Sequence, residues 1–178
     1  MEEIGATQIL AMAEEGSKVI HPRAVKAGLA TRTPILARNT FSDAPGTLIH
    51  HREIKGDLKP MALAHREKQV LLEIRSMQGP RKIVPELLEV GRFRFLLIND
   101  VYLAERLAKL RAAFGNFEME DGWATASIVL SRMEVREAPD LEEAETMPPA
   151  PGVWSYLLRE DHLNSALDVL FQRHGLGN

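Results

Sequence analysis

Histidine and arginine side chains gather at two places where their types and spacing could do chemistry. His21, Pro22 and Arg23 stand where a helix is expected to begin, and the free backbone N–H groups of a helix start can hold an anion. A turn that leads the chain into the helix uses the same residues, and we favour that interpretation. His50 and His51 carry metal-capable nitrogens, but adjacent side chains on an extended segment point apart. We therefore predict no metal site.

Acidic side chains are concentrated in one stretch, residues 133–152, which ends in the sequence MPPAPG. An acidic run could attract a cation or a basic partner. Like charges more often repel one another and remain in water, and proline favours irregular structure. We therefore expect residues 133–152 to form a solvated loop or a partly disordered segment.

The composition narrows the class of protein. The chain has 178 residues, a formal net charge of −3 and no cysteine. A slightly acidic protein has no broad attraction for nucleic acid or for an anionic membrane, and the absence of cysteine excludes disulfides and thiolate catalysis. No apolar run reaches the roughly 20 residues that a membrane-spanning helix needs, and the first residues lack the pattern of a signal peptide. We expect a cytoplasmic protein without nucleic-acid or membrane partners.

The first part of the chain predicts a small helix-rich unit. The hydrophobic pattern and the turn residues indicate helices over residues 7–16 and 23–30, strands over 35–38 and 47–49, and a linker over 50–60. Gly16 is expected to end the first helix, because glycine readily adopts the backbone conformation found after a helix terminus.

The second part contains a degenerate two-fold repeat of strand, strand and helix. The first copy has strands at 69–75 and 93–98 and a helix at 103–114, and the second has strands at 123–130 and 153–158 and a helix at 161–173. The helix spacing predicts apolar faces formed by Leu103, Leu107, Leu110 and Phe114 in the first copy and by Leu163, Leu167, Leu170 and Phe171 in the second. Trp123 and Trp154 are expected to pack in a core or at a dimer interface.

Five stretches of sequence resemble the aspartokinase family. The sequences GSKVIHPR at residues 16–23, TPILARNTF at 33–41 and APGTLI at 44–49 are similar to the closing segment of an aspartokinase catalytic domain. The sequence VWSYLLREDHLNSALDVL at residues 153–170 resembles the last strand and helix of the regulatory ACT domains in that family, and LAHRE at 63–67 resembles the start of the first such domain. The resemblance places Lys18 and Val19 at positions that approach nucleotide in aspartokinases.

The resemblance implies an α+β fold with two shortened, ferredoxin-like ACT modules. We expect an amino-acid-kinase remnant at residues 1–52, a first module at 61–122 and a second at 123–178. In ACT modules the turn after the first strand presents backbone groups to an amino-acid effector. The matching residues here are Ser76, Met77, Gln78 and Gly79 in the first module and Ser131 and Arg132 in the second. The stretch between the first two strands of each copy leaves little room for the helix and strand that the family has there.

The sequence favours regulation over catalysis. The lysine and glycine-rich loops and the acidic loop with which aspartokinases position nucleotide and aspartate do not occur, and neither does a phosphate-binding glycine motif. The first hypothesis is therefore a non-catalytic regulatory protein or subunit without a cofactor, which senses lysine or threonine as a homodimer. The alternative is an assembly scaffold or partner subunit with no small-molecule site, which binds a separately encoded kinase subunit.

Overall fold

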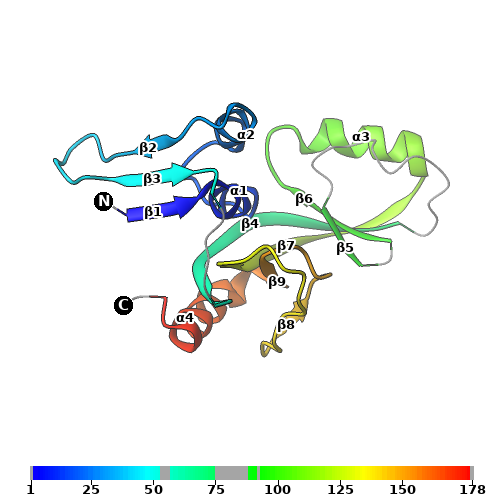
Figure 1. Ribbon diagram of the computed structural model, residues 1–178. Helices are drawn as coiled ribbons and strands as arrows, with labels where there is room; N and C mark the ends of the chain where they lie inside the picture. The colour runs from blue at the N-terminus through cyan, green and yellow to red at the C-terminus, as the bar shows by residue number, and fades with distance from the viewer. Residues whose placement is uncertain (1, 53–56, 75–87, 92, 177–178) are drawn as a thin grey trace.

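The computed structural model describes residues 2–52, 57–74, 88–91 and 93–176. Within these ranges the chain forms a three-stranded sheet, a six-stranded sheet and four α-helices. Figure 1 shows how these elements are arranged. The α+β class expected from the sequence is confirmed. No helix in the described ranges is long and apolar enough to cross a membrane.

The three-stranded sheet belongs to the N-terminal unit, residues 2–52. Its elements are β1 (Glu2–Gly5), α1 (Ala6–Glu14), α2 (Pro22–Thr31), β2 (Ile35–Ala37) and β3 (Thr47–His50). The strand order is β1-β3-β2, with β1 parallel and β2 antiparallel to β3. Residues buried between the helices and the sheet form its core, namely Ala6, Ile9, Val25 and Ile49.

The start of α2 explains the His21, Pro22 and Arg23 sequence. The backbone N–H of Arg23 donates to Nδ1 of His21 at 3.1 Å, and Pro22 occupies the first turn of the helix. Proline suits this position because its missing N–H would have no partner there. These residues therefore begin the helix, as the favoured interpretation predicted.

The rest of the described chain forms the six-stranded sheet and the helices that pack on it. Its strands are β4 (Pro60–Ile74), β5 (Leu88–Gly91), β6 (Arg94–Ile98), β7 (Phe117–Leu130), β8 (Ala144–Thr146) and β9 (Val153–Arg159). Its helices are α3 (Leu103–Phe114) and α4 (Leu163–His174), and the 3-10 turn η1 (Glu160–His162) precedes α4. The strand order is β5-β6-β4-β7-β9-β8, and every neighbouring pair is antiparallel.

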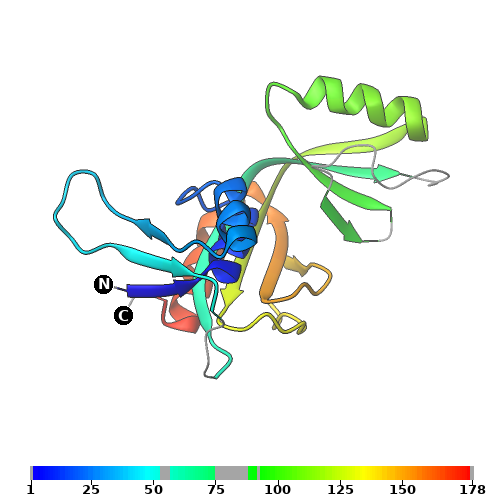
Figure 2. The same cartoon turned by 45° about the horizontal axis from the view of Figure 1, so that its top comes forward.

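The two long central strands, β4 and β7, extend from the end of the sheet that α3 covers to the end that α4 covers, as Figure 2 shows. We call these two ends the α3 half and the α4 half. The α3 half has a core under α3 formed by Val70, Leu72, Ile74, Phe95, Leu97, Leu107 and Leu110. The α4 half has a core under α4 formed by Ala124, Ala126, Ile128, Leu130, Leu141, Tyr156, Leu158, Leu163, Ala166 and Leu170. The pairing of β4 with β7 shifts register between Arg66 and Leu71, so an irregularity separates the two halves.

The predicted order of strand, strand and helix recurs in both copies, but each copy has a further strand between its two predicted strands, β5 in the first and β8 in the second. The expectation that these stretches leave little room for a strand is therefore wrong. β4 and β7 begin earlier than predicted, and the expected linker ends where β4 starts at Pro60. The loop prediction for residues 133–152 is wrong in part, because this stretch contains β8 and the buried Leu141. The hydroxyl of Tyr156 also donates to the carbonyl of Pro139 at 3.0 Å. Phe171, expected in the core, is 46 % exposed.

Both tryptophans pack within the chain. A core position was one of the two alternatives expected from the sequence, the other being a dimer interface. Trp154 lies against the core of the α4 half, and its ring centroid is 5.8 Å from that of His174. Trp123 packs beside Leu71 and Leu96 on the other face of the sheet, with the guanidinium of Arg159 4.8 Å from its ring centroid.

Candidate functional site

The N-terminal unit joins the six-stranded sheet through one face of α1. Apolar side chains from α1, β4, β7 and β9 form this junction, namely Ala11, Met12, Ala62, Val129 and Val153. Alone, the strands of the N-terminal unit would expose unpaired backbone and apolar groups. The junction covers part of this apolar surface against the six-stranded sheet.

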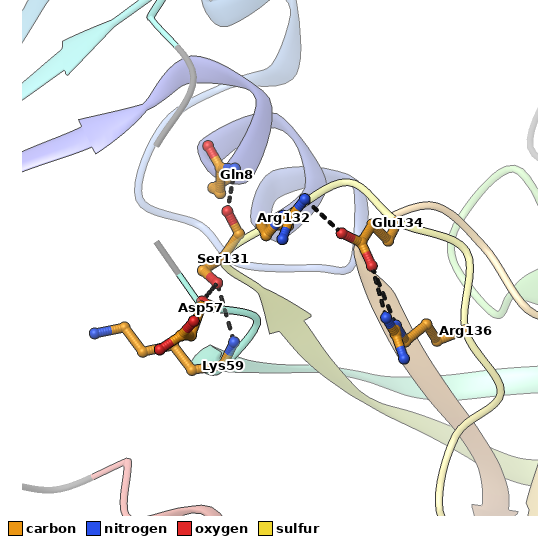
Figure 3. Close-up of polar contacts among 7 residues, drawn as sticks. All are labelled: Gln8, Asp57, Lys59, Ser131, Arg132, Glu134 and Arg136. Atoms are coloured by element: carbon orange, nitrogen blue, oxygen red, sulfur yellow. Dashed lines mark hydrogen bonds and ion pairs between the residues drawn. The ribbon is translucent and has the colours of Figure 1, made fainter. Parts of the chain in front are cut away.

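A buried hydrogen-bond cluster accompanies the apolar contact, and Figure 3 shows it. The side-chain amide Nε2 of Gln8 donates to the carbonyl of Ser131 at 3.0 Å, and both residues are 3 % exposed. The hydroxyl of Ser131 donates to the carbonyl of Asp57 at 2.9 Å and accepts from the N–H of Lys59 at 3.0 Å. Ser131 thus ties α1, the end of β7 and the segment before β4 together.

A second polar contact reaches the same sheet from the end of α1. The hydroxyl of Ser127 donates to a carboxylate oxygen of Glu15 at 2.7 Å and lies 3.0 Å from the hydroxyl of Ser155. A hydrogen bond to a charged group is stronger than one between neutral groups. The junction therefore has a defined geometry as well as apolar contact.

The neighbouring Arg132 forms part of a short charge chain that leads away from the junction. Its guanidinium lies 2.8 Å from Glu134, whose other carboxylate oxygen is 2.9 Å from Arg136 (Figure 3). The hydrogen bond from Arg136 and the charges of both arginines hold the pKa of Glu134 below its usual value. These groups are largely exposed, so solvent weakens the pairing.

The predicted effector residues fall into two groups. Ser76, Met77, Gln78 and Gly79 lie outside the described residues. Ser131 and Arg132 are next to each other at the junction, and both already bond to protein groups. A ligand at this second turn would compete with those contacts. The effector site stays a prediction.

Lys18 and Val19 lie in the loop between α1 and α2, and both are exposed. Val19 is 67 % exposed, whereas Lys18 lines a groove that β4 and β6 complete. The nucleotide contact that the resemblance implies for these two residues stays a prediction. The sequence reasoning missed the groove, because Lys18 and β4 are far apart along the chain.

His50, the first histidine of the pair in the expected linker, contacts nearby groups. Nε2 of His50 lies 3.7 Å from a carboxylate oxygen of Glu3, and its Nδ1 accepts from the N–H of Arg52 at 3.2 Å. Across the described ranges, no three histidine or acidic side chains lie close enough together to hold a metal ion.

Ser131→Ala is expected to destabilise the protein by about 1–3 kcal/mol, because the N–H of Lys59 and the carbonyl of Asp57 both lose a partner. Urea unfolding of the variant and the wild type measures the difference. Ser165→Ala is the matched control, since its hydroxyl bonds to His162 on the exposed surface and its loss should stay within about 0.5 kcal/mol. Equal losses for the two variants would contradict a structural role for Ser131.

The chain is similar to aspartokinases in one short sequence segment and in its fold. No protein-family profile matches the chain. A segment of 47 residues, 25 % of this chain, is 45 % identical to aspartokinase 1 of Bacillus subtilis (strain 168) and covers 12 % of that protein.

Solved structures resemble nearly the whole chain. E. coli aspartokinase III with aspartate and ADP matches 97 % of it with a TM-score of 0.66 and 19 % identity, and the same enzyme with lysine and aspartate matches 98 % with 0.66 and 16 %. Clostridium acetobutylicum aspartate kinase matches 97 % with 0.65 and 11 %. The chain covers 46 %, 46 % and 48 % of these proteins, about half of each. The resemblance to aspartokinases inferred from the sequence is thus confirmed, and it extends to the fold of almost the entire chain.

Proposed function

We propose that this chain is a non-catalytic regulatory unit of aspartokinase type, which senses an amino acid, lysine or threonine, through its two ACT-like halves. The observation that carries the proposal is the fold shared with E. coli aspartokinase III, whose solved structures include one with bound lysine and aspartate. The two halves each combine antiparallel strands with one helix, and they share β4 and β7. A ligand that changes one half would therefore act on strands that continue into the other.

The sequence supports the non-catalytic part of the proposal. Phosphoryl transfer depends on groups that position the phosphates and neutralise the developing charge. The glycine-rich and acidic loops that do this in aspartokinases do not occur in the sequence. Lys18 alone cannot supply that arrangement, so we assign it no catalytic role.

The N-terminal unit supports the second candidate, a partner subunit that assembles with a kinase chain or with a second copy. Within the described strands, β1 and β2 each pair only with β3, so both outer edges of the sheet carry free backbone groups. Leu36 on β2 is 49 % exposed, and Phe41 in the following loop is 96 % exposed. Open edges beside apolar side chains are typical of surfaces that bind another chain.

Thermal unfolding in the presence of lysine, threonine, methionine, diaminopimelate or Mg-ATP tests the proposal. An effector at about 100 times its dissociation constant is expected to stabilise the folded protein by about 2.7 kcal/mol, because it binds the native state alone. A response to one amino acid and none to its mirror image supports sensing. No response to any amino acid at millimolar concentration, together with co-purification of a kinase chain, would favour the partner-subunit candidate.

A further inference from the structure

A large groove lies between the N-terminal unit and the α3 half, away from the contacts of Ser131 and Arg132. Its volume is about 970 Å³, which is within the usual range for small-molecule sites. Four segments line it, which are the end of α1 with the loop after it, the middle of β4, Leu88 of β5, and β6 with the residues that follow it. Figure 1 shows α1 lying beside β4, so segments far apart in the sequence make the two sides.

The charged lining of the groove has an excess of free cations. Lys18, Arg66 and Lys68 line it, and no ion pair joins any of them to another residue in the described ranges. Of the two acidic residues of the lining, Asp100 is paired with Arg106 at 2.9 Å, whereas Glu67 lies 3.5 Å from His65, whose ring is charged only when protonated. The described lining thus holds three unpaired cations against one unpaired carboxylate, Glu67. The groove therefore favours an anion.

The rest of the lining is largely apolar. Leu63, Leu88 and Leu96 lie along the groove, and Ile98 beside them is 40 % exposed. Gln69 also lines it and is 2 % exposed, and its Oε1 has no hydrogen-bond partner in the described part of the chain. An unpaired buried acceptor is costly, and a rotation of this amide toward a ligand N–H or O–H would satisfy it.

The backbone fixes the positions of the cations. Gly16 has a φ of +106°, and a Cβ at this position would lie 2.3 Å from the carbonyl oxygen of His65 and 2.7 Å from Cγ of Arg66. Lys68 has a φ of 53°, an uncommon value for a residue other than glycine, and it lies at the register shift between β4 and β7. A close approach and an uncommon backbone conformation thus place Lys18, Arg66 and Lys68 around one groove. Backbone outliers of this kind cluster at ligand sites.

We infer that this groove binds a small organic anion, a carboxylate or phosphate monoester carried on an apolar stem. Lys18, Arg66 and Lys68 hold the anionic group, and the leucines and Ile98 contact the stem. The site is distinct from the predicted effector turns and does not depend on amino-acid sensing, so a response to lysine or threonine can be present or absent without deciding it.

Isothermal titration with octanoate and octyl phosphate tests the inference on the full chain. We expect saturable binding of one equivalent to at least one of them, and the tighter of the two identifies the anionic group. Octylamine reverses the charge on the same stem and should not bind. Inorganic phosphate has the charge without the stem and should bind at least tenfold more weakly than octyl phosphate.

Variants locate the binding to the groove. Lys18→Gln and Arg66→Gln should each weaken it about tenfold, the effect of losing one charge-assisted contact of about 1.4 kcal/mol. Lys109→Gln is the matched control, because it removes an exposed lysine on α3 outside the groove. Melting temperatures within the error of the wild type show that each variant is folded. No binding at millimolar concentration, equal binding of octylamine, equal binding of inorganic phosphate, or equal affinity in Arg66→Gln and Lys109→Gln would each overturn the inference.

Discussion

Leu110→Ala is expected to lower the free energy of unfolding by about 2–5 kcal/mol, the usual cost of removing a buried leucine side chain. Leu110 is 0 % exposed and belongs to the core under α3. The α4 half should also unfold at a lower urea concentration. The reason is that β4 and β7 contribute residues to both cores, so one half cannot unfold without exposing part of the other.

The two tryptophans make this expectation measurable. In a Trp123→Phe background, Trp154 is the only remaining tryptophan and reports on the core under α4. We expect urea unfolding followed by Trp154 fluorescence to shift to lower urea in Leu110→Ala. Leu170→Ala, which truncates a buried leucine in the core next to Trp154, should produce a shift of similar size.

Val101→Ala is the control for this experiment, because Val101 is 89 % exposed and its truncation should change stability by less than about 0.5 kcal/mol. The alternative outcome is equally clear. If Trp154 fluorescence in Leu110→Ala follows the wild-type curve while circular dichroism shows an earlier transition, the two halves unfold separately. In that case the division at residues 122 and 123 proposed from the sequence would describe two independent domains.

Gly16→Ala is expected to lower the free energy of unfolding by about 2–5 kcal/mol, because it combines backbone strain with a steric clash. A φ of +106° is strained for any residue with a side chain, and the added methyl group would lie 2.3 Å from the carbonyl oxygen of His65. Backbone cannot move aside as a flexible side chain can. We therefore expect the loop after α1 to separate from β4, which would loosen the contact of Glu15 with Ser127.

Gly175→Ala separates strain from clash. Gly175 has a φ of +60° after α4, and a Cβ there would meet nothing within 4 Å. Its substitution should lower the free energy of unfolding by about 1–2 kcal/mol, because a residue with a side chain is strained in the left-handed conformation. Urea unfolding of the two variants gives the difference, and limited proteolysis of the loop after α1 shows whether it has separated. A Gly16→Ala variant no less stable than Gly175→Ala would refute the proposed close packing.

Local sequence signals predicted the four helices and the strands β2, β3, β6 and β9, but missed the short strands β1, β5 and β8. The apolar spacing in α3 and the turn residues around α2 depend only on neighbours in the sequence, so periodicity was enough to find them. The early part of β7 was missed because the acidic residues Glu118, Glu120 and Asp121 occupy it, and the early part of β4 was missed because polar residues separate residues 61–64 from the apolar end of the strand. In β4 these are residues 65–68, where the strand is irregular and half open to the groove. β8 was missed because it is only three residues long and lies in an acidic, proline-containing stretch.

The polar contacts at the junction could not be predicted from the sequence. Gln8 and Ser131 are separated by 123 positions, and neither has a neighbour that marks it as buried. The resemblance to aspartokinases selected Ser131 for a different reason, namely its place after a strand. The groove raises the same difficulty, since its cations come from two segments that only the folded chain brings together.

The pairing of β4 with β7 has a consequence for how the protein is made. Pro60 is paired with Leu130, so the first part of β4 lacks its partner until β7 has left the ribosome. At about 5–20 residues per second, this strand waits several seconds during synthesis. The α3 half can form β4-β6 contacts earlier, because Gln69 to Glu73 pair with residues near position 96. The nascent chain therefore carries an unpaired, partly apolar strand through much of its translation, and it is in this interval that we expect chaperones to bind it.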